Sequence, residues 1–132
     1  MTSLRESAIR RALAGDPLVG REVRVLPEVG STNDYLKEAA REGAPEGLAV
    51  LAERQTAGKG RLGRSFQSPA GLGLWMSVLL RPTCPPERLP PVTALTAAAC
   101  AGAIREVCGA EVGVKWPNDL VLDGRKLCGI LT

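Results

Sequence analysis

Ten residues, 55–64, constrain this chain more than any other stretch of its sequence. They include glycines at positions 58, 60 and 63, and glycine lets a backbone curl tightly and approach a ligand closely. They also carry Lys59, Arg61 and Arg64, which place three cations on one short loop. The apolar run Leu48–Ala52 before them predicts a buried strand, so the loop leaves a rigid element near its end. This combination predicts a binding site for an anion with several oxygens, phosphate above all.

Two general phosphate-binding motifs compete for this loop. Its glycines fit the Gly-x-Gly-x-x-Gly spacing of dinucleotide-binding proteins, and the stretch from Gly58 to Ser65 differs from the P-loop pattern only by Arg64 in place of lysine. Both motifs need a helix to begin within the loop, whereas residues 66–71 have the composition of a turn. No acidic residue follows about 20 positions later, as the dinucleotide motif requires. Neither motif is favoured, and a solvated loop without a ligand is a further alternative.

The composition indicates one globular domain and argues against nucleic-acid binding. The chain has 132 residues, of which 45% are hydrophobic, and this is enough for a core. Its net charge of +3 is small, and the surplus lies around residues 54–64 rather than along a helix or a tail. The aromatic residues are too few and too scattered to stack bases; they are Tyr35, Phe66, Trp75 and Trp116. The charge therefore points to a local anion site.

The cysteines and the absence of histidine narrow the chemistry. Cys84, Cys100, Cys108 and Cys128 lack Cys-x-x-Cys spacing, and three fall in apolar segments, so we expect small reduced core residues rather than disulfides or zinc ligands. Without histidine the chain has no Ser-His-Asp triad and no His-Glu-x-x-His zinc site, and no metal ligands are predicted. The charged N-terminus and the short apolar run at 72–80 predict neither a signal peptide nor a membrane helix. A cytoplasmic protein without membrane contact is expected.

Residues 1–80 are expected to alternate helices and strands. Ser3-x-x-Glu6 has the form of a capping box, and Gly15 can end the helix that follows it. Residues 31–33, Ser-Thr-Asn, start a second helix that ends at Gly43; they can cap this helix, contact a ligand, or do both. Strands are predicted at Glu22–Leu26, Leu48–Ala52 and Gly73–Leu80, the last two of them buried.

Residues 81–132 are expected to form a helix and a hairpin. The predicted elements are an extended, proline-rich connection at 81–90, a helix from Pro91 through Val107 that Gly109 ends, a strand at Glu111–Trp116, and strands Asp119–Leu122 and Lys126–Leu131 paired across an Asp123-Gly124 turn. The sequence stops within this strand pattern. An unpaired final strand favours self-association, for example as a homodimer, or a missing partner segment.

Three blocks of the sequence, taken in order, resemble biotin protein ligases. Residues 55–64 are similar to that family's Gly-Arg-Gly-Arg-Arg-Gly-Arg loop, with Lys59 and Leu62 as departures. The Ser-Thr-Asn block at 31–33 precedes the loop, and Lys-Trp-Pro-Asn-Asp-Leu at 115–120 follows it, continued by Gly-Arg-Lys-Leu-Cys-Gly-Ile-Leu at 124–131. The resemblance covers about residues 25 to 132.

This resemblance implies an α+β fold. The expected architecture is a mixed β-sheet flanked by helices, like the catalytic core shared by class II aminoacyl-tRNA synthetases and biotin-lipoate ligases, and incomplete at the C-terminus. Residues 1–132 would form a partial catalytic domain whose C-terminal part is absent. Residues 1–20 would hold a leading helix and are too few for the helix-turn-helix domain of the family's repressors, so no DNA-binding role is expected.

The resemblance also implies an activity and a set of site residues. Biotin ligases use ATP, accompanied by Mg²⁺, to convert biotin to biotinyl-adenylate, and then pass biotin to a lysine of a biotin carboxyl carrier protein, as in acetyl-CoA carboxylase or a related carboxylase. The catalytic residues would be Lys115 and Arg61. Biotin would contact Ser31, Thr32, Asn33, Gln55, Lys59, Gly60, Arg61 and Lys115. The nucleotide would contact Gly58, Lys59, Arg61, Arg64, Phe66 and Asn118.

Several alternatives accompany this interpretation. Outside its sequence block, Lys115 would be read as a solvated charge, and Asn118 and Asp119 are expected to order a turn, with nucleotide or magnesium contact as the alternative. A lipoate or octanoate transferase has a related fold but uses a different loop with a histidine, which this chain lacks. Half a ligase domain could also be a catalytically silent module that binds biotin or the carrier protein.

Overall fold

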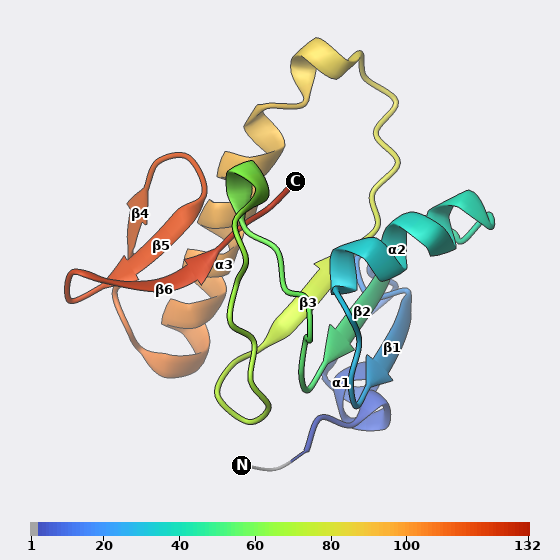
Figure 1. Cartoon of the computed structure of the whole chain (residues 1–132), viewed down its shortest axis with the longest axis horizontal. Helices are drawn as coiled ribbons and strands as arrows, with labels where there is room; N and C mark the ends of the chain where they lie inside the picture. The colour runs from blue at the N-terminus through green and yellow to red at the C-terminus, as the bar shows by residue number, and fades with distance from the viewer. Residues whose placement is uncertain (1–2) are drawn as a thin grey trace. The chain divides into compact units, whose positions relative to one another are not determined.

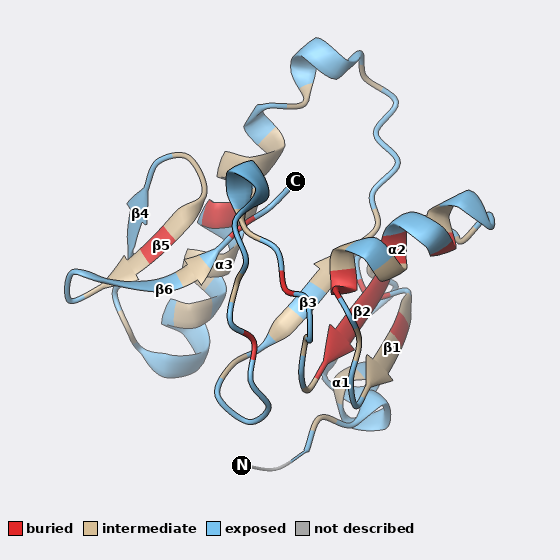
Figure 2. Cartoon of the chain, viewed as in Figure 1, coloured by how far each residue is buried: buried red, intermediate tan, exposed pale blue. Residues whose placement is uncertain are grey.

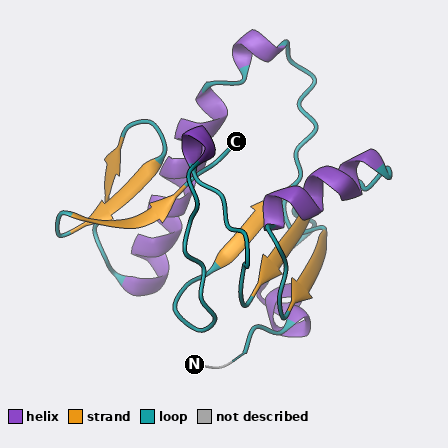
Figure 3. Ribbon diagram, in the orientation of Figure 1, coloured by secondary structure: helices purple, strands orange, loops and turns teal. Residues whose placement is uncertain are grey.

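The computed structural model describes residues 3–132, and the chain divides after Arg81 into two compact units. Figures 1 and 3 show their helices and strands. The first unit contains α1 (Glu6–Ala12), β1 (Glu22–Leu26), α2 (Thr32–Arg41), β2 (Leu48–Ala52), the 3₁₀ turn η1 (Arg61–Gly63) and β3 (Trp75–Val78). The second contains the 3₁₀ turn η2 (Pro86–Arg88), α3 (Pro91–Cys108), β4 (Gly113–Lys115), β5 (Asp119–Leu122) and β6 (Arg125–Gly129).

The first unit is built on β2, the apolar run that the sequence predicts as a buried strand. All five of its residues are buried, and it lies between β1, which runs parallel to it, and β3, which runs antiparallel (Figure 2). Leu36 and Ala39 of α2 pack against Leu48 and Val50, so the helix covers one face of this mixed sheet. Burying a side chain such as Leu48 stabilises the fold by about 1.5–3 kcal/mol. The predicted mixed sheet with a flanking helix is confirmed.

The leading helix differs from its predicted form at both ends. α1 begins after Arg5, which makes no side-chain capping bond, so the expected Ser3-x-x-Glu6 capping box is wrong. The Ser3 hydroxyl donates instead to Glu53 Oε1 at 3.0 Å, and the Leu4 backbone N–H donates to the same oxygen at 2.5 Å. The helix ends at Ala12 rather than at a glycine. The Glu53 carboxylate just beyond β2 therefore holds Ser3 and Leu4 in place of a local cap.

β3 is shorter and less buried than the predicted strand at Gly73–Leu80. It spans Trp75–Val78, and none of its residues is fully buried. The reason is its place at the edge of the sheet, where only β2 pairs with it. Gly73 packs closely against the Trp75 ring. A Cβ at this position would lie only 2.5 Å from a ring carbon.

The second unit packs α3 beside the antiparallel sheet β4-β5-β6. Ala97 of the helix meets Leu120 and Ile130 in its core. α3 ends where predicted, at Gly109, whose φ of 68° suits a left-handed C-cap. The hairpin turn is also confirmed, since Asp123 and Gly124 both have positive φ, 50° and 74°, as a two-residue turn of this kind requires. β4 is shorter than predicted and exposed.

The cysteines are reduced, as expected, and two of them, Cys100 and Cys128, pack against the core of the second unit. All four are free thiols; Cys108 is exposed and the other three are only half-buried. The described residues show no group of three His, Cys, Asp or Glu side chains that could hold a metal ion. Of the helices that the structure describes, none combines the length and the apolar character needed to cross a lipid bilayer.

Candidate functional site

A chain of hydrogen bonds at the start of α2 joins segments from three parts of the sequence. Gln55 Oε1 accepts from the Thr32 backbone N–H at 2.8 Å and from the Thr32 hydroxyl at 3.0 Å. Thr32 Oγ1 also lies 2.8 Å from Ser77 Oγ on β3, and the Ser77 hydroxyl donates to Asn33 Oδ1. Thr32 is only 4% exposed, whereas Asn33, Gln55 and Ser77 are half-buried, so the cluster reaches from the interior to the surface.

The backbone N–H of Thr32 determines how the Gln55 amide is oriented. A backbone N–H can only donate, so the amide oxygen must face α2 and the amide nitrogen must point away. That nitrogen donates to Ser68 Oγ at 2.9 Å, and the Ser68 hydroxyl donates in turn to the Phe66 carbonyl at 3.3 Å. Ser68 is 3% exposed. Gln55 is therefore held at both ends of its amide. The sequence prediction did not include Ser68, which provides one of these two contacts.

The hydroxyl protons of this cluster are fewer than its oxygen contacts. Thr32 and Ser77 supply two protons, whereas three contacts link them with each other and with the carbonyl oxygens of Gln55 and Asn33. The carbonyl oxygens can only accept. One of the three contacts therefore has no hydroxyl proton, which the Asn33 amide nitrogen would supply if it faced Ser77.

The glycine-rich loop folds back on itself as an irregular hairpin. Lys59 and Ser65 form a bridge, the Gly60 N–H donates to the Arg64 carbonyl at 2.7 Å, and the Phe66 N–H donates to the Gly58 carbonyl at 2.8 Å. Its tip is the single 3₁₀ turn η1, in which Leu62 has a φ of 58°. No α-helix begins in the loop, so the dinucleotide and P-loop interpretations lose the helix that both require.

Gly58 attaches this hairpin to the hydrogen-bonded cluster. A Cβ at position 58 would lie 2.4 Å from the Phe66 carbonyl oxygen, 2.7 Å from Ser68 Oγ and 3.3 Å from Gln55 Nε2. Any side chain would therefore displace the groups that hold Gln55. Gly60 differs, because a Cβ there meets Arg64 only at 3.5 Å.

Lys59 forms an ion pair with the first turn of α2. Its ammonium lies 2.8 Å from Asp34 Oδ1 and 2.7 Å from Asp34 Oδ2, and both side chains are about half exposed. The hydrogen bond from Lys59 holds the pKa of the Asp34 carboxyl below its ordinary value. Arg61 begins the turn η1 at the loop tip and Arg64 follows that turn, and both residues are exposed. The loop thus carries three cations, and the ammonium of Lys59 forms an ion pair with α2.

Phe66 and Trp75 form an aromatic pair next to the loop. Their ring centroids lie 6.0 Å apart with an interplanar angle of 69°, an edge-to-face arrangement. The Trp75 indole N–H donates to the Pro69 carbonyl at 3.2 Å. This apolar surface follows the cationic loop directly in the chain.

The remaining predicted site residues belong to the second unit. Lys115 is exposed at the end of β4, and within residues 82–132 it has no ion-pair partner. Asn118 orders the chain beside β5: its carbonyl accepts from the Ile130 N–H at 2.8 Å, and its side-chain amide donates to the Ile130 carbonyl at 3.3 Å.

Lys126 is a cation that the sequence prediction did not select. Its ammonium lies 3.0 Å from Asp119 Oδ1, and the Asp119 side chain is only 20% exposed. The lysine lies over Gly129, where a Cβ would come within 3.0 Å of its Cε and Nζ. The signal that could have identified Lys126 is the spacing Lys126-x-x-Gly129, because Gly129 pairs with Asp119 on the neighbouring strand.

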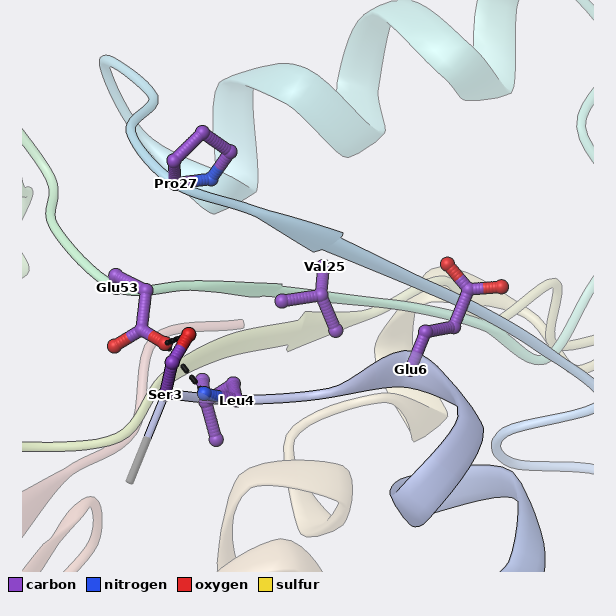
Figure 4. Close-up of a pocket in the computed structure, with 6 residues that line it drawn as sticks. All are labelled: Ser3, Leu4, Glu6, Val25, Pro27 and Glu53. Carbon is purple, nitrogen blue, oxygen red and sulfur yellow. Dashed lines mark hydrogen bonds between the residues drawn. The ribbon is translucent and has the colours of Figure 1, made fainter. Parts of the chain in front are cut away.

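The structure brings one group of predicted residues together within the first unit: Ser31, Thr32, Asn33, Gln55, Gly58 and Lys59. Two hollows lie elsewhere. One, of about 310 Å³, is lined by Ser3, Leu4, Glu6, Val25, Pro27 and Glu53 (Figure 4). The other, of about 290 Å³, lies along α3 in the second unit. The ligand roles of the predicted residues are taken up as a proposal below.

Comparison with known proteins identifies the family. Residues 25–132 match the model of the biotin/lipoate A/B protein ligase family. The chain is 41% identical over 129 residues to the bifunctional ligase/repressor BirA of Bacillus subtilis, covering 98% of this chain and 39% of that protein. It is 36% identical over 133 residues to the biotin–[acetyl-CoA-carboxylase] ligase of Mycobacterium tuberculosis, covering 97% and 50%. The chain therefore spans no more than about half the length of these relatives.

Solved structures agree with the sequence comparison. The biotin protein ligase of Leishmania major in complex with biotinyl-5-AMP matches with a TM-score of 0.72 and 33% identity, over 83% of this chain and 51% of that one. The biotin protein ligase of Aquifex aeolicus in complex with biotin and ATP matches with a TM-score of 0.69 and 37% identity, over 84% and 46%. The predicted fold and family are confirmed: this chain belongs to the biotin/lipoate A/B protein ligase family.

Proposed function

We propose that this chain supplies the part of a biotin protein ligase that binds biotin and ATP and joins them as biotinyl-adenylate. The observation that carries the proposal is the hydrogen-bonded cluster of Thr32, Gln55 and Ser77, in which Thr32 is buried and the other two are half-buried, beside a glycine loop with three cations. The chain matches only about half of its relatives' length, so their whole reaction is not established for it. Transfer of biotin to a carrier protein is therefore proposed here as well.

The cluster suits the ureido ring of biotin. That ring presents one carbonyl acceptor and two N–H donors, and it needs partners of both kinds. Residues 31–33 provide hydroxyl and amide groups at the start of α2, and Gln55 is fixed by bonds at both ends of its amide. A carbonyl oxygen of Asn33 or Gln55 could take a ureido N–H. Hydrogen bonds already fix these side chains, so less ordering entropy would be lost on binding.

The loop suits the next step, in which the biotin carboxylate approaches the α-phosphate of ATP. Two unit charges of the same sign 4 Å apart repel by about 4 kcal/mol at an effective dielectric constant of 20. Arg61 and Arg64 would grip phosphate or carboxylate oxygens in a bidentate manner, and Lys59 would act as a point charge. To contact a phosphate or carboxylate of the ligand, the Lys59 ammonium would have to leave Asp34 or bind both groups at once. Phe66, followed by its Trp75 partner, would pack against the adenine.

The second unit would supply a further ammonium, and two lysines compete for that role. Lys115 is the residue that the sequence block favours, whereas Lys126 is the one that the structure holds in place, over Gly129 and against Asp119. A free lysine side chain loses up to about 2 kcal/mol of rotamer entropy when it is immobilised, and a lysine already held loses less. Asn118 would contact the nucleotide. Mg²⁺ would arrive with ATP and neutralise its phosphates.

Biotin-dependent exchange between ATP and pyrophosphate tests this proposal, because only adenylate formation returns labelled pyrophosphate to ATP. We expect exchange with biotin and none with lipoate or octanoate. Lys115→Met and Lys126→Met, measured side by side, assign the ammonium: the variant that loses exchange while keeping biotin affinity carries it. If neither lysine variant nor Arg61→Gly lowers exchange, the charge-neutralisation mechanism is wrong.

Arg61→Gly also tests how the intermediate is retained. Removing one charged hydrogen-bonding group costs about 1.5–3 kcal/mol, so we expect biotinyl-adenylate to leave roughly 10- to 100-fold faster. The melting temperature should change little because the side chain is exposed. Gly60→Pro should also speed release of the adenylate by stiffening the loop, although it additionally removes the N–H that donates to the Arg64 carbonyl. Equal losses of adenylate retention and thermal stability would contradict this assignment.

A second candidate is a catalytically silent module that binds biotin or the carrier, because the hydrogen-bonded cluster around Gln55 could hold a ligand without any chemical step. Calorimetry with biotin, with and without ATP, separates the two. Biotin binding that ATP does not alter, together with absence of exchange, would support the module. Biotinylation of a purified carrier domain, detected with streptavidin, would support the complete reaction.

A further inference from the structure

Two thiols meet where α3 packs on the second sheet. Cys100 of α3 and Cys128 of β6 are hydrogen-bonded to each other through their side chains. Both pack against the same small core of Ala97, Leu120 and Ile130, and both are free and only half-buried. They come from segments that are distant in sequence, so the fold has brought them together. Neither cysteine is used by the proposed ligase chemistry.

The pair divides into one reactive thiol and one protonated partner. The hydrogen bond from Cys128 lowers the pKa of the Cys100 thiol, so this sulfur loses its proton more readily than an ordinary cysteine. The same hydrogen bond, together with burial, raises the pKa of the Cys128 thiol, which therefore keeps its proton. The groups of β5 and β6 that face Cys128 are the Asp119 carboxylate and the Lys126 ammonium. A thiolate hydrogen-bonded to a second thiol is the arrangement that oxidises to a disulfide.

We propose that Cys100 and Cys128 are a modification site at which a peroxide forms a reversible disulfide between α3 and β6. The Cys100 thiolate attacks one oxygen of hydrogen peroxide, the O–O bond breaks, and the leaving hydroxide takes up a proton to become water. The resulting sulfenic acid at Cys100 then receives the Cys128 sulfur, whose proton goes to the departing hydroxyl as a second water. Two thiols and one peroxide thus yield one disulfide and two waters, and a dithiol reductant reverses the reaction.

Both thiols pack against one small core, so the fold holds them next to each other. A disulfide would require their sulfurs to approach to about 2.05 Å. The pairing register places Cys128 opposite Leu120 of the central strand, so the bond would tie the helix to the middle of the sheet rather than to a loose end. Cys108, exposed at the end of α3, and Cys84, before η2, serve as internal references for unselective oxidation.

Intact-protein mass spectrometry after peroxide treatment tests the proposal directly. The reduced full chain is exposed to equimolar hydrogen peroxide at pH 7, quenched with an alkylating reagent and digested without reduction. Before alkylation the chain should become about 2 Da lighter, and after alkylation it should carry two alkyl groups fewer than the untreated chain. The digest should contain a cross-linked peptide pair with Cys100 and Cys128. The Cys84→Ser/Cys108→Ser double variant should give the same product, and dithiothreitol should remove it.

Single variants separate the two chemical steps. In Cys128→Ser the sulfenic acid at Cys100 has no resolving thiol, so it should accumulate and be trapped by dimedone. In Cys100→Ser the remaining Cys128 should resist the same peroxide dose. Circular dichroism shows whether each variant is folded, and the double variant at positions 84 and 108 tests the pair without altering it. Persistence of four alkylated thiols in the folded chain, or disulfides that join Cys84 or Cys108 as readily, would overturn the proposal.

Discussion

Gly58→Ala is the substitution that best tests how the loop is joined to the polar cluster. The added methyl would lie 2.4 Å from the Phe66 carbonyl oxygen and 2.7 Å from Ser68 Oγ. Position 58 does not have a positive φ, so alanine suits the backbone and only the lack of space opposes it. The Phe66 carbonyl has little freedom, because its own N–H donates to the Gly58 carbonyl at 2.8 Å. The methyl must therefore break existing hydrogen bonds or push the hairpin outward.

The expected cost follows from those contacts. Overpacking a tight site costs about 1–3 kcal/mol, and losing one hydrogen bond near Gln55 adds about 1 kcal/mol. A total of roughly 2–4 kcal/mol, with a urea slope of about 1.5 kcal/mol per molar, lowers the unfolding midpoint by about 1–3 M. The matched control is Gly60→Ala in the same loop, where the nearest atoms lie at 3.5 Å and the change should stay within about 0.5 kcal/mol.

Tryptophan fluorescence during urea unfolding measures the difference between the two variants. A Trp116→Phe background leaves Trp75, which lies in the first unit next to Phe66, as the reporter. Biotin titration of the same proteins shows whether the displaced Gln55 amide also weakens binding. Equal midpoints for the two alanine variants would refute the reasoning, because both add one methyl to one loop and only the space around it differs.

Three further substitutions test other contacts of the site. Lys59→Met should raise the pKa of Asp34 toward its ordinary value, which NMR titration of the carboxyl carbon can follow. Because the ion pair lowers this pKa, the pair stabilises the fold at a pH above the ordinary value, and this stabilisation is lost as the pH falls through the lowered value. An unchanged pKa would contradict the pairing. Thr32→Val should lower the free energy of unfolding by about 1–3 kcal/mol, because it leaves polar partners of Thr32 unsatisfied. Thr56→Val, which removes an exposed hydroxyl, should cost far less. Similar urea midpoints for the two variants would mean that the hydrogen bonds of Thr32 do not stabilise the fold. Gly129→Ala should push the overlying lysine ammonium away from its aspartate with little change in stability, visible as faster labelling of that lysine by an amine reagent; unchanged labelling would mean that the glycine is not needed for the pair.

Local sequence determined the elements and their ends. The uninterrupted apolar run Leu48–Ala52 could satisfy its side chains only as a strand covered on both faces, and it became the buried centre of the first sheet. Gly109 ends α3, and Asp123-Gly124 forms the hairpin turn, because these positions need positive φ that few residues tolerate. The three motif blocks likewise identified the family, since a motif is a matter of residue order and spacing.

Tertiary structure alone decided which polar groups became partners. Thr32 and Ser77 are 45 positions apart, and they meet because β3 pairs with β2 in one particular register beside the start of α2. The capping-box prediction failed for the same reason, since Glu53 reached Ser3 from the end of a distant strand. Side-chain propensities act over one or two turns of chain, whereas the nearest donor for a buried acceptor is set by how whole elements pack. The sequence therefore predicted the chemistry of the site, whereas the packing around β2 determined which hydrogen bonds hold its side chains in place.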